Sequence, residues 1–374
     1  MNKNHRLVFN LQRFANPNTN TTSSTGLSDE MKTFYNKDLL DYAEPNLVHD
    51  QFGDKYPIPK NGGKTIEFRA YDSLAKALTP LTEGVTPDGD SLNVTAITAT
   101  VDQYGNYVTI SDILELTAID NNVVQSLKVL GSQAGRTLDS ITRDALAGGT
   151  NVIYAGGVQT RKGLSVTSNY LKPVIFFQAA AQLEAMNAPM IDGSYVAIIH
   201  PYAAFDLMTS SEWIDVHKYA DPEAIFQGEI GKLGNVRFVQ STEAKIWKDN
   251  TCPDFYFAST DTTVDASKTY YTESGGVYTA VASPTGNPST SGYYEKDYAG
   301  VFGTLVLGAN AYGVTELTGG GLETIIKQLG SGEDPLNQRA TVGWKATKVA
   351  KRLIEQYMVR IESCGSYSKT VAAN

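Results

Sequence analysis

Residues that could perform chemistry are few in this 374-residue chain, and they are scattered along it. There are four histidines and two cysteines, and neither type occurs at the spacing of a metal site. The Walker phosphate-binding pattern is absent, as are the HExxH, GxSxG and paired CxxC motifs. We therefore predict that the chain is not an enzyme and that it binds no cofactor or metal.

A few side chains nevertheless occupy positions that could suggest a site. His200 follows the apolar segment YVAII and precedes Pro201, so a hydrolase that uses His200 is one alternative. We favour a strand-end histidine that is satisfied by local hydrogen bonds. Cys252 has no base near it in the sequence and is expected to be a small core residue. Asp88 and Asp90 fall short of the oxygen cage that Ca²⁺ requires, which favours a solvated turn.

The charge and composition favour an acidic globular protein. Its net charge is -9, with 41% hydrophobic and 19% charged residues, so its body should repel nucleic acid. No apolar run approaches the roughly 18 residues of a membrane span, so no membrane partner is expected. Cys252 and Cys364 lie far apart, which argues against a disulfide framework. One basic run is expected to be a solvated face, with DNA contact as the alternative: Lys345, Lys348, Lys351 and Arg352.

The first 16 residues form a basic segment that contains Lys3, Arg6 and Arg13 but no acidic residue. The polar stretch PNTNTTSSTG follows and predicts a flexible linker. The segment is either a tail without a role or an arm that lies along a neighbour or faces packaged nucleic acid. We favour the arm, followed by a short helix from Ser28 that Pro45 ends.

Alternating apolar and polar residues then predict an extended β-hairpin. The strands are KTIEFRAYD and SLNVTAITATVDQYGNYVTISD, and the turn-rich tip between them is LTPLTEGVTPDGDS. Two strands alone expose both faces and both edges and are marginal in water, so we expect a neighbouring subunit to cover them. The candidate residues for that contact are Arg69, Lys76, Glu83, Asp88, Asp90 and Tyr104.

After Asp120 the apolar residues recur every three or four positions, which predicts one amphipathic helix of about 26 residues that Gly148 ends. Gly131 and Gly135 would weaken this helix unless packing compensates or another backbone passes close by. Helices and strands then alternate, as expected for a sheet covered by helices. The strand YMVRIES should return to that sheet near the long helix.

A tyrosine-rich segment interrupts this pattern between residues 259 and 298. Turn formers separate short Tyr-rich strands, which predicts a small inserted β unit. It is either a stabilising hairpin or a projecting module that meets solvent, a glycan or a decoration protein. The residues expected on its surface are Tyr270, Tyr271, Tyr278, Tyr293 and Tyr294.

The order of these parts resembles that of tailed-bacteriophage major capsid proteins with the Hong Kong 97-type fold. LTEGVTPDG and ITATVDQYGNYVTISDILELTAID are similar to the extended-loop region of the N4-like major capsid family. QRATVGWKATKVAKRLIEQYMVRIES is similar to the C-terminal end of that family, and NLQRFAN to a leader on head proteins of phages of Gram-positive hosts. The resemblance covers roughly residues 30–258 and 299–365 and leaves out the tyrosine-rich insert.

The resemblance implies an α+β (mixed α/β) capsid fold with five parts. These are an N-terminal arm and first helix (1–45), an extended loop (46–118), a peripheral domain with a spine helix (119–173 and 336–374), an axial domain (174–335) and its β insertion (259–298).

The function implied by the resemblance is that of a major head protein. The chain would self-assemble into hexamers and pentamers of an icosahedral shell around double-stranded DNA. Its partners would be a portal, a separate scaffolding protein and a decoration protein, and it would be assembled in the host cytoplasm and reside in the virion. The alternative is a phage tail or surface structural protein whose tyrosine-rich insert binds a glycan or the host.

Overall fold

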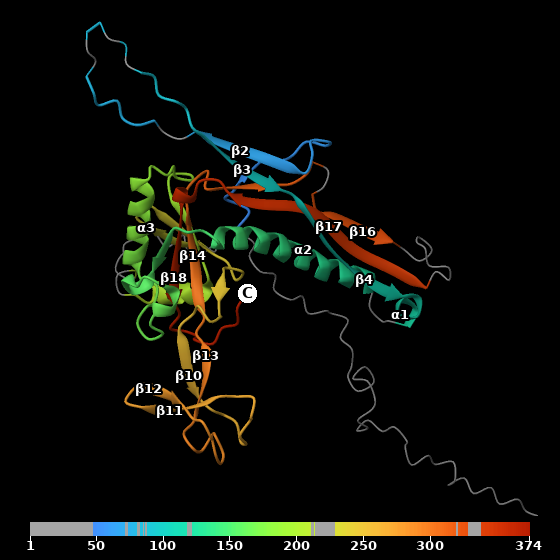
Figure 1. The fold of residues 1–374 in the computed structure, drawn as a ribbon. Helices are drawn as coiled ribbons and strands as arrows, with labels where there is room; N and C mark the ends of the chain where they lie inside the picture. Colours follow the sequence, from blue (N-terminus) through green and yellow to red (C-terminus); the bar gives the residue numbers. More distant parts are fainter. Residues whose placement is uncertain are drawn as a thin grey trace, which may run out of the picture. The chain divides into compact units, whose positions relative to one another are not determined.

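The computed structural model describes residues 48–71, 74–80, 83–84, 86, 88–117, 122–210, 213, 229–318, 321–327 and 338–374. These residues form a mixed α+β protein with a seven-, a five-, a four- and a two-stranded sheet (Figure 1). The predicted arm with Lys3, Arg6 and Arg13, and the first helix, lie outside the described residues. No helix within the described residues is long and apolar enough to span a membrane.

The seven-stranded sheet carries the largest core. Its strands, in order, are β5 (Val152–Tyr154), β18 (Met358–Cys364), β14 (Val301–Leu307), β6 (Tyr195–Ile199), β8 (Val236–Gln240) and β7 (Glu229–Leu233), with β9 (Ile246–Trp247) beside β14. The helices α3 (Pro173–Ala185) and α4 (Pro201–Met208) pack with the odd-numbered residues of β6. Val196 and Ile198 point to the other face, where Leu146 of α2 packs. Short 3₁₀ turns occur at Ala155–Gly157, Arg161–Gly163 and Glu355–Tyr357.

The five-stranded sheet lies under the long helix α2 (Asn122–Ala147), with the short helix α1 (Asp112–Thr117) preceding it. Its strands are β1 (Asp54–Lys55), β15 (Tyr312–Thr315), β17 (Arg339–Arg352), β16 (Glu323–Lys327) and β4 (Asp102–Ser111). Leu130 and Ala134 of α2 pack on Val342 and Trp344 of β17. The helix predicted from the sequence is therefore present and uses its apolar stripe to cover this sheet.

The predicted hairpin is present only in part. Strand β2 (Thr65–Tyr71) pairs with β3 (Val94–Thr100) in a seven-residue antiparallel ladder. The prediction was wrong for the second half of the alternating segment, since β4 leaves the hairpin and pairs with β17 from Asp102↔Lys348 to Ser111↔Arg339. Alternation marks a strand but does not identify its partner, so the two halves look alike in the sequence.

The four-stranded sheet is the predicted tyrosine-rich β unit. It contains β10 (Asp254–Ala258), β13 (Tyr294–Tyr298), β11 (Tyr270–Ser274) and β12 (Val277–Ala280), in that order. Strand β10 precedes the predicted boundary at residue 259, and it pairs with β13 from Asp254↔Tyr298 to Ala258↔Tyr294. The two ends of the unit therefore lie side by side, as an insertion into a scaffold requires.

Candidate functional site

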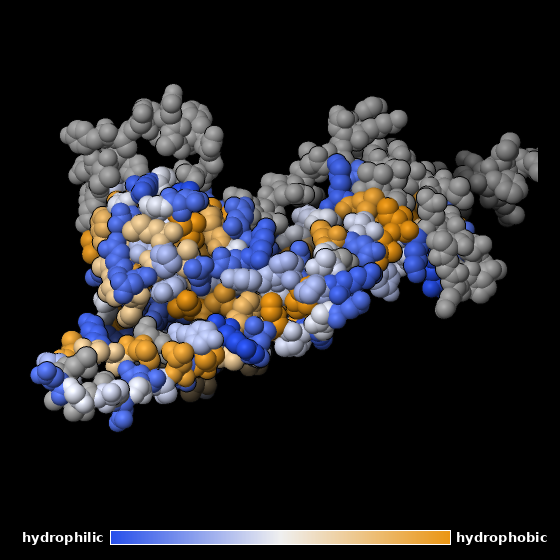
Figure 2. Space-filling model, turned by 90° about the horizontal axis from the view of Figure 1, so that it is seen from above, coloured by the Kyte–Doolittle hydropathy of each residue, from blue (hydrophilic) through white to orange (hydrophobic). Residues whose placement is uncertain are grey.

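The ribbon formed by β2 and β3, with the loop 72–93 between them, exposes apolar side chains. Leu78 is 82% exposed and Leu92 is 68% exposed, and Tyr71, Leu74 and Val94 are exposed as well. Among the described residues, the ribbon is partly covered by its own chain near its base, where Ala99 is buried and Ile66, Phe68 and Ile97 are half-buried. On the face seen in Figure 2, orange apolar residues also reach the surface. A two-stranded ribbon with such side chains is expected to contact another protein surface.

The predicted contact residues differ in whether they are free to meet a neighbour. Arg69 Nε donates to Glu67 Oε1 at 2.8 Å, so its charge already has a partner in its own strand. Lys76, Glu83, Asp88 and Asp90 are exposed in the loop, where a neighbour could reach them. Among the described residues no group of acids, histidines or cysteines could hold a metal ion.

Tyr104 is accounted for within its own subunit, because it is half-buried and packs against the cluster under α2. Its ring is part of the contact between the five-stranded sheet and the helix. The outer-face residue that sequence analysis missed on the same strand is Tyr107, which is 68% exposed. Residues 104 and 107 point to opposite faces of β4, as an odd spacing in a strand requires.

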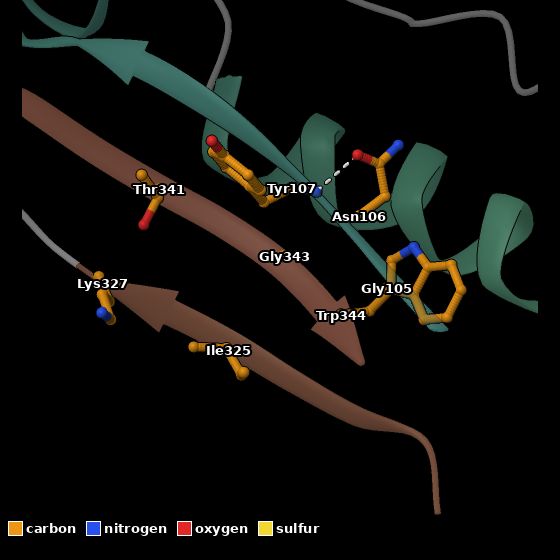
Figure 3. Close-up of a pocket in the computed structure, with 8 residues that line it drawn as sticks. All are labelled: Gly105, Asn106, Tyr107, Ile325, Lys327, Thr341, Gly343 and Trp344. Atoms are coloured by element: carbon orange, nitrogen blue, oxygen red, sulfur yellow. Dashed lines mark hydrogen bonds between the residues drawn. The ribbon is translucent and has the colours of Figure 1, made fainter. Parts of the chain in front are cut away.

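A groove of about 520 Å³ lies across β4, β17 and β16 (Figure 3). Gly343 of β17 pairs with Tyr107 on one side and with Ile325 on the other. Because Gly343 has no side chain, the surface is hollow between these two exposed or half-exposed apolar residues. The lining residues are Gly105, Asn106, Tyr107, Ile325, Lys327, Thr341, Gly343 and Trp344.

Two glycines allow the strands that line the groove to approach closely. A Cβ atom at Gly343 would lie 2.8 Å from Tyr107 Cβ, and one at Gly105 would lie 2.6 Å from the carbonyl oxygen of Trp344. Both distances are too short for a real side chain, so each position requires glycine. The available sequence signal for this groove was a glycine inside each of two alternating segments, Gly105 and Gly343.

The floor of the groove is fixed to α2 by one side chain. Gln133 Oε1 accepts hydrogen bonds from Asn106 Nδ2 at 3.1 Å and from Trp344 Nε1 at 3.4 Å. Helix, β4 and β17 are thereby connected at one point. The groove is thus a feature of a rigid sheet rather than of a loop.

A buried polar cluster attaches residues 49 and 50, which follow the undescribed N-terminal segment, to α2 and β17. His49 is fully buried; its Nδ1 lies 2.6 Å from Asp139 Oδ2 and its backbone N–H donates to Asp139 Oδ1 at 2.9 Å. Lys348 donates to Asp50 and, at 3.0 Å, to the carbonyl oxygen of Leu138. Residues 49 and 50 are thus anchored on the long helix and on β17.

Three of the four residues of the predicted basic face have acidic partners within the chain itself. Lys348 is buried in the cluster with Asp50, which contradicts its expected solvation. Lys345 Nζ lies 3.0 Å from Glu323, and Arg352 Nε lies 2.8 Å from Glu355. Lys351 is exposed and forms no ion pair with the described residues, so it is the residue of this run that remains for a contact with DNA.

The side chains that resembled catalytic groups have structural roles. His200 caps the N-terminus of α4, where its Nδ1 accepts a hydrogen bond from the Tyr202 N–H at 3.2 Å, which confirms the local satisfaction expected for it. Burial lowers the pKa of His200 to about 4, so the ring is neutral at pH 7. Cys252 and Cys364 are free and buried, and burial raises the pKa of the Cys364 thiol to about 12.

The tyrosines predicted on the surface of the insert divide into two groups. Tyr270 is fully buried, so its prediction was wrong: its hydroxyl donates to Asp261 Oδ2 at 2.7 Å and accepts from the Asp265 N–H at 3.0 Å. Tyr271, Tyr278, Tyr293 and Tyr294 are half-buried. Sequence analysis missed Tyr256, which belongs to the same sheet.

A long helix on a five-stranded sheet, a helix-covered seven-stranded sheet and a two-stranded ribbon together define the class of fold. It is the Hong Kong 97-type fold of phage capsid proteins, as the sequence predicted.

Particular capsid structures match almost the whole chain. The capsid of cyanophage Pam1 matches with a TM-score of 0.61 at 11% identity, covering 92% of this chain and 100% of the other. The capsid of cyanophage P-SCSP1u matches with a TM-score of 0.58 at 16% identity, covering 89% of this chain and 93% of the other. The capsid of Ralstonia phage GP4 matches with a TM-score of 0.58 at 14% identity, covering 95% of this chain and 100% of the other. At such identities the likeness establishes the fold alone.

No protein-family model matches the sequence, and no curated protein matches it.

Proposed function

We propose that the chain is the major capsid protein of a tailed bacteriophage, related to the N4-like major capsid family. It self-assembles into hexamers and pentamers of an icosahedral shell that encloses double-stranded DNA in the virion. The observation that carries the proposal is the β2–β3 ribbon, whose apolar side chains are exposed on a chain with a phage capsid fold.

The ribbon works by contact with an adjacent subunit. Leu74, Leu78 and Leu92 lose water-exposed surface when a neighbour covers them, and the groove beside β17 is the candidate receiving surface. Each contact is weak, but a closed shell makes many of them at once, so avidity supplies the strength. Function in this view depends on geometry rather than on catalysis.

The remaining parts fit the same proposal. The whole chain has a net charge of -9, which keeps shells soluble, while the basic arm with Lys3, Arg6 and Arg13 is suited to the DNA-filled interior. The portal, a separate scaffolding protein and a decoration protein are the expected partners, and assembly takes place in the host cytoplasm. The five domains predicted from the sequence remain part of this proposal.

Deleting residues 74–92 tests the proposal, because this removes Leu74, Leu78 and Leu92 and leaves the β2–β3 ladder. We expect a folded subunit with an unchanged thermal midpoint that no longer forms shells or tubes in negative-stain images. Normal shells from the deletion variant would contradict the mechanism. Isolated trimers of the parent protein would favour the tail or surface protein instead.

A further inference from the structure

Four tyrosines from four different strands gather on one face of the insert; we call Tyr256, Tyr271, Tyr278 and Tyr294 the tyrosine face. The rings of Tyr256 and Tyr278 stack with centroids 4.0 Å apart and an interplanar angle of 5°. Tyr271 meets Tyr256 edge-on at 5.1 Å, and Tyr294 meets Tyr278 edge-on at 5.2 Å. The rings hold one another in place, so little conformational entropy remains to be lost on binding.

Strand register places these rings on a common face. Tyr271 pairs with Tyr294, Tyr294 pairs with Ala258, and Ala258 lies two residues from Tyr256 on β10. Cross-strand partners and residues two apart share a face of a sheet. The arrangement therefore follows from the alternation of the sequence.

The opposite face supplies the insert with its own anchor. There the buried Tyr270 donates to Asp261, and Lys268 Nζ lies 2.9 Å from Asp261 Oδ2 and 3.0 Å from Glu295 Oε2. This polar network closes the connection between β10 and β11 onto the sheet. The tyrosine face is thus not the sole means by which the insert holds its fold.

The hydroxyl groups of the tyrosine face are available to a ligand. None of the four has a hydrogen-bond partner among the residues that the structure describes, and all four residues are only half-buried. Buried tyrosines elsewhere use this group: Tyr195 donates to the Ala188 carbonyl at 3.0 Å, and Tyr312 to that of His49. The four rings therefore combine apolar surface with unengaged donors and acceptors.

The charges of the insert indicate which class of ligand the tyrosine face could bind. The insert from Asp254 to Tyr298 carries six carboxylates and two lysines, so it repels anionic polymers. The carboxylates on the tyrosine face already have partners, since Asp254 lies 2.9 Å from Lys296 Nζ and Glu273 accepts from the Gly276 N–H at 2.8 Å. A cation would have to compete with these, whereas a neutral ligand would not.

We propose that the tyrosine face binds neutral saccharide chains. The C–H face of a pyranose ring packs on a tyrosine ring, while its hydroxyl groups exchange hydrogen bonds with the phenols. Saccharide recognition is a function separate from shell building, and it does not depend on the capsid proposal.

Calorimetric titration of the full chain tests the proposal with defined probes. These are neutral hexasaccharides of glucose and of N-acetylglucosamine, with a heparin hexasaccharide and hexalysine as charged probes. We expect at least one neutral probe to bind and both charged probes to fail. Absence of binding by every neutral probe, or stronger binding of a charged probe, would overturn the proposal.

Removal of the hydroxyl groups locates the site. The fourfold variant Tyr256→Phe, Tyr271→Phe, Tyr278→Phe, Tyr294→Phe keeps the rings and should lower affinity for the neutral probe about tenfold or more. Tyr107→Phe, an exposed tyrosine outside the insert, is the matched control and should bind as the parent does.

Unchanged affinity in a folded fourfold variant would refute the assignment. If that variant loses its thermal transition, the single variants Tyr271→Phe and Tyr294→Phe replace it. Each should then weaken binding, and parent-like affinity in both would be equally decisive against the tyrosine face.

Discussion

Glu362 is a fully buried carboxylate that holds two arginines of the seven-stranded sheet region in place. It accepts from Arg161 Nε at 2.6 Å and Nη2 at 2.8 Å, and Arg360 Nε lies 2.8 Å from Oε1, the oxygen that accepts from Arg161 Nη2. The Arg161 guanidinium also stacks on Trp247, 4.1 Å from the ring centroid. Arg360 in turn donates to the Gly149 carbonyl just beyond α2, so this group connects the sheet to the long helix.

Replacing that carboxylate should be costly. Glu362→Gln leaves two arginines without a buried counter-charge, and we expect a loss of about 3–5 kcal/mol in the free energy of unfolding. Denaturant titration of the subunit measures it. The control is Asp102→Asn, which breaks the exposed Lys64–Asp102 pair and should cost less than about 1 kcal/mol. Equal effects of the two substitutions would contradict the buried role.

His200 should make the subunit sensitive to acid. Its pKa in the fold is about 4, below the ordinary 6.5, so folding favours the neutral ring. This contribution is complete above about pH 6.5 and is lost as the pH falls towards 4. His200→Asn keeps a helix-capping acceptor but does not titrate. We expect the thermal midpoint of the variant to fall less than that of the parent over this range, and parallel curves would refute the assignment.

Among the elements, those with a local signal were predicted well. The stripe of α2 repeats every three or four residues, and YVAII is a short apolar run between breakers, so neither depends on a distant partner. The β4–β17 ladder joins residues more than 200 positions apart, and alternation alone fits any partner. The groove was missed for the same reason, because two of the three strands that line it are β4 and β17.

Two glycines differ in whether the fold requires them: at Gly343 the strands approach too closely for a side chain, and at Gly131 there is room for one. A Cβ at Gly343 would meet Tyr107, whereas a Cβ at Gly131 in α2 would have open space around it, so no close backbone explains that glycine. Gly343→Ala should destabilise the five-stranded sheet, while Gly131→Ala should stabilise the helix by about 1 kcal/mol. Denaturant titration of both variants is the measurement. A neutral or stabilising effect of Gly343→Ala would show that the groove does not need its glycine.

For the whole molecule, the sequence predicted that an exposed contact surface exists better than it predicted which residues form that surface. It indicated a bare ribbon and named charged residues, yet Arg69 is paired within its own strand. The exposed apolar side chains include Leu74, Leu78 and Leu92, which the sequence did not single out. Hydrophobic residues in a turn-rich stretch give no periodic signal, so their exposure emerges only from the fold. The sequence likewise predicted the tyrosine face only in part. It named Tyr271, Tyr278 and Tyr294 but not Tyr256, whose ring contacts depend on the order of the strands in the sheet.

The exposed leucines make the final prediction specific to assembly. Leu78→Asp places a charge where a neighbour is proposed to bury an apolar side chain, so shells should not form. The isolated subunit should change its free energy of unfolding by less than about 0.5 kcal/mol, because Leu78 is already exposed. Val277→Asp, at an exposed position on β12, is the matched control and should leave assembly intact. Sedimentation and negative-stain images distinguish the outcomes. Shells from Leu78→Asp would mean that the ribbon does not build the shell, because a carboxylate at position 78 is unfavourable only if a neighbouring subunit buries that position.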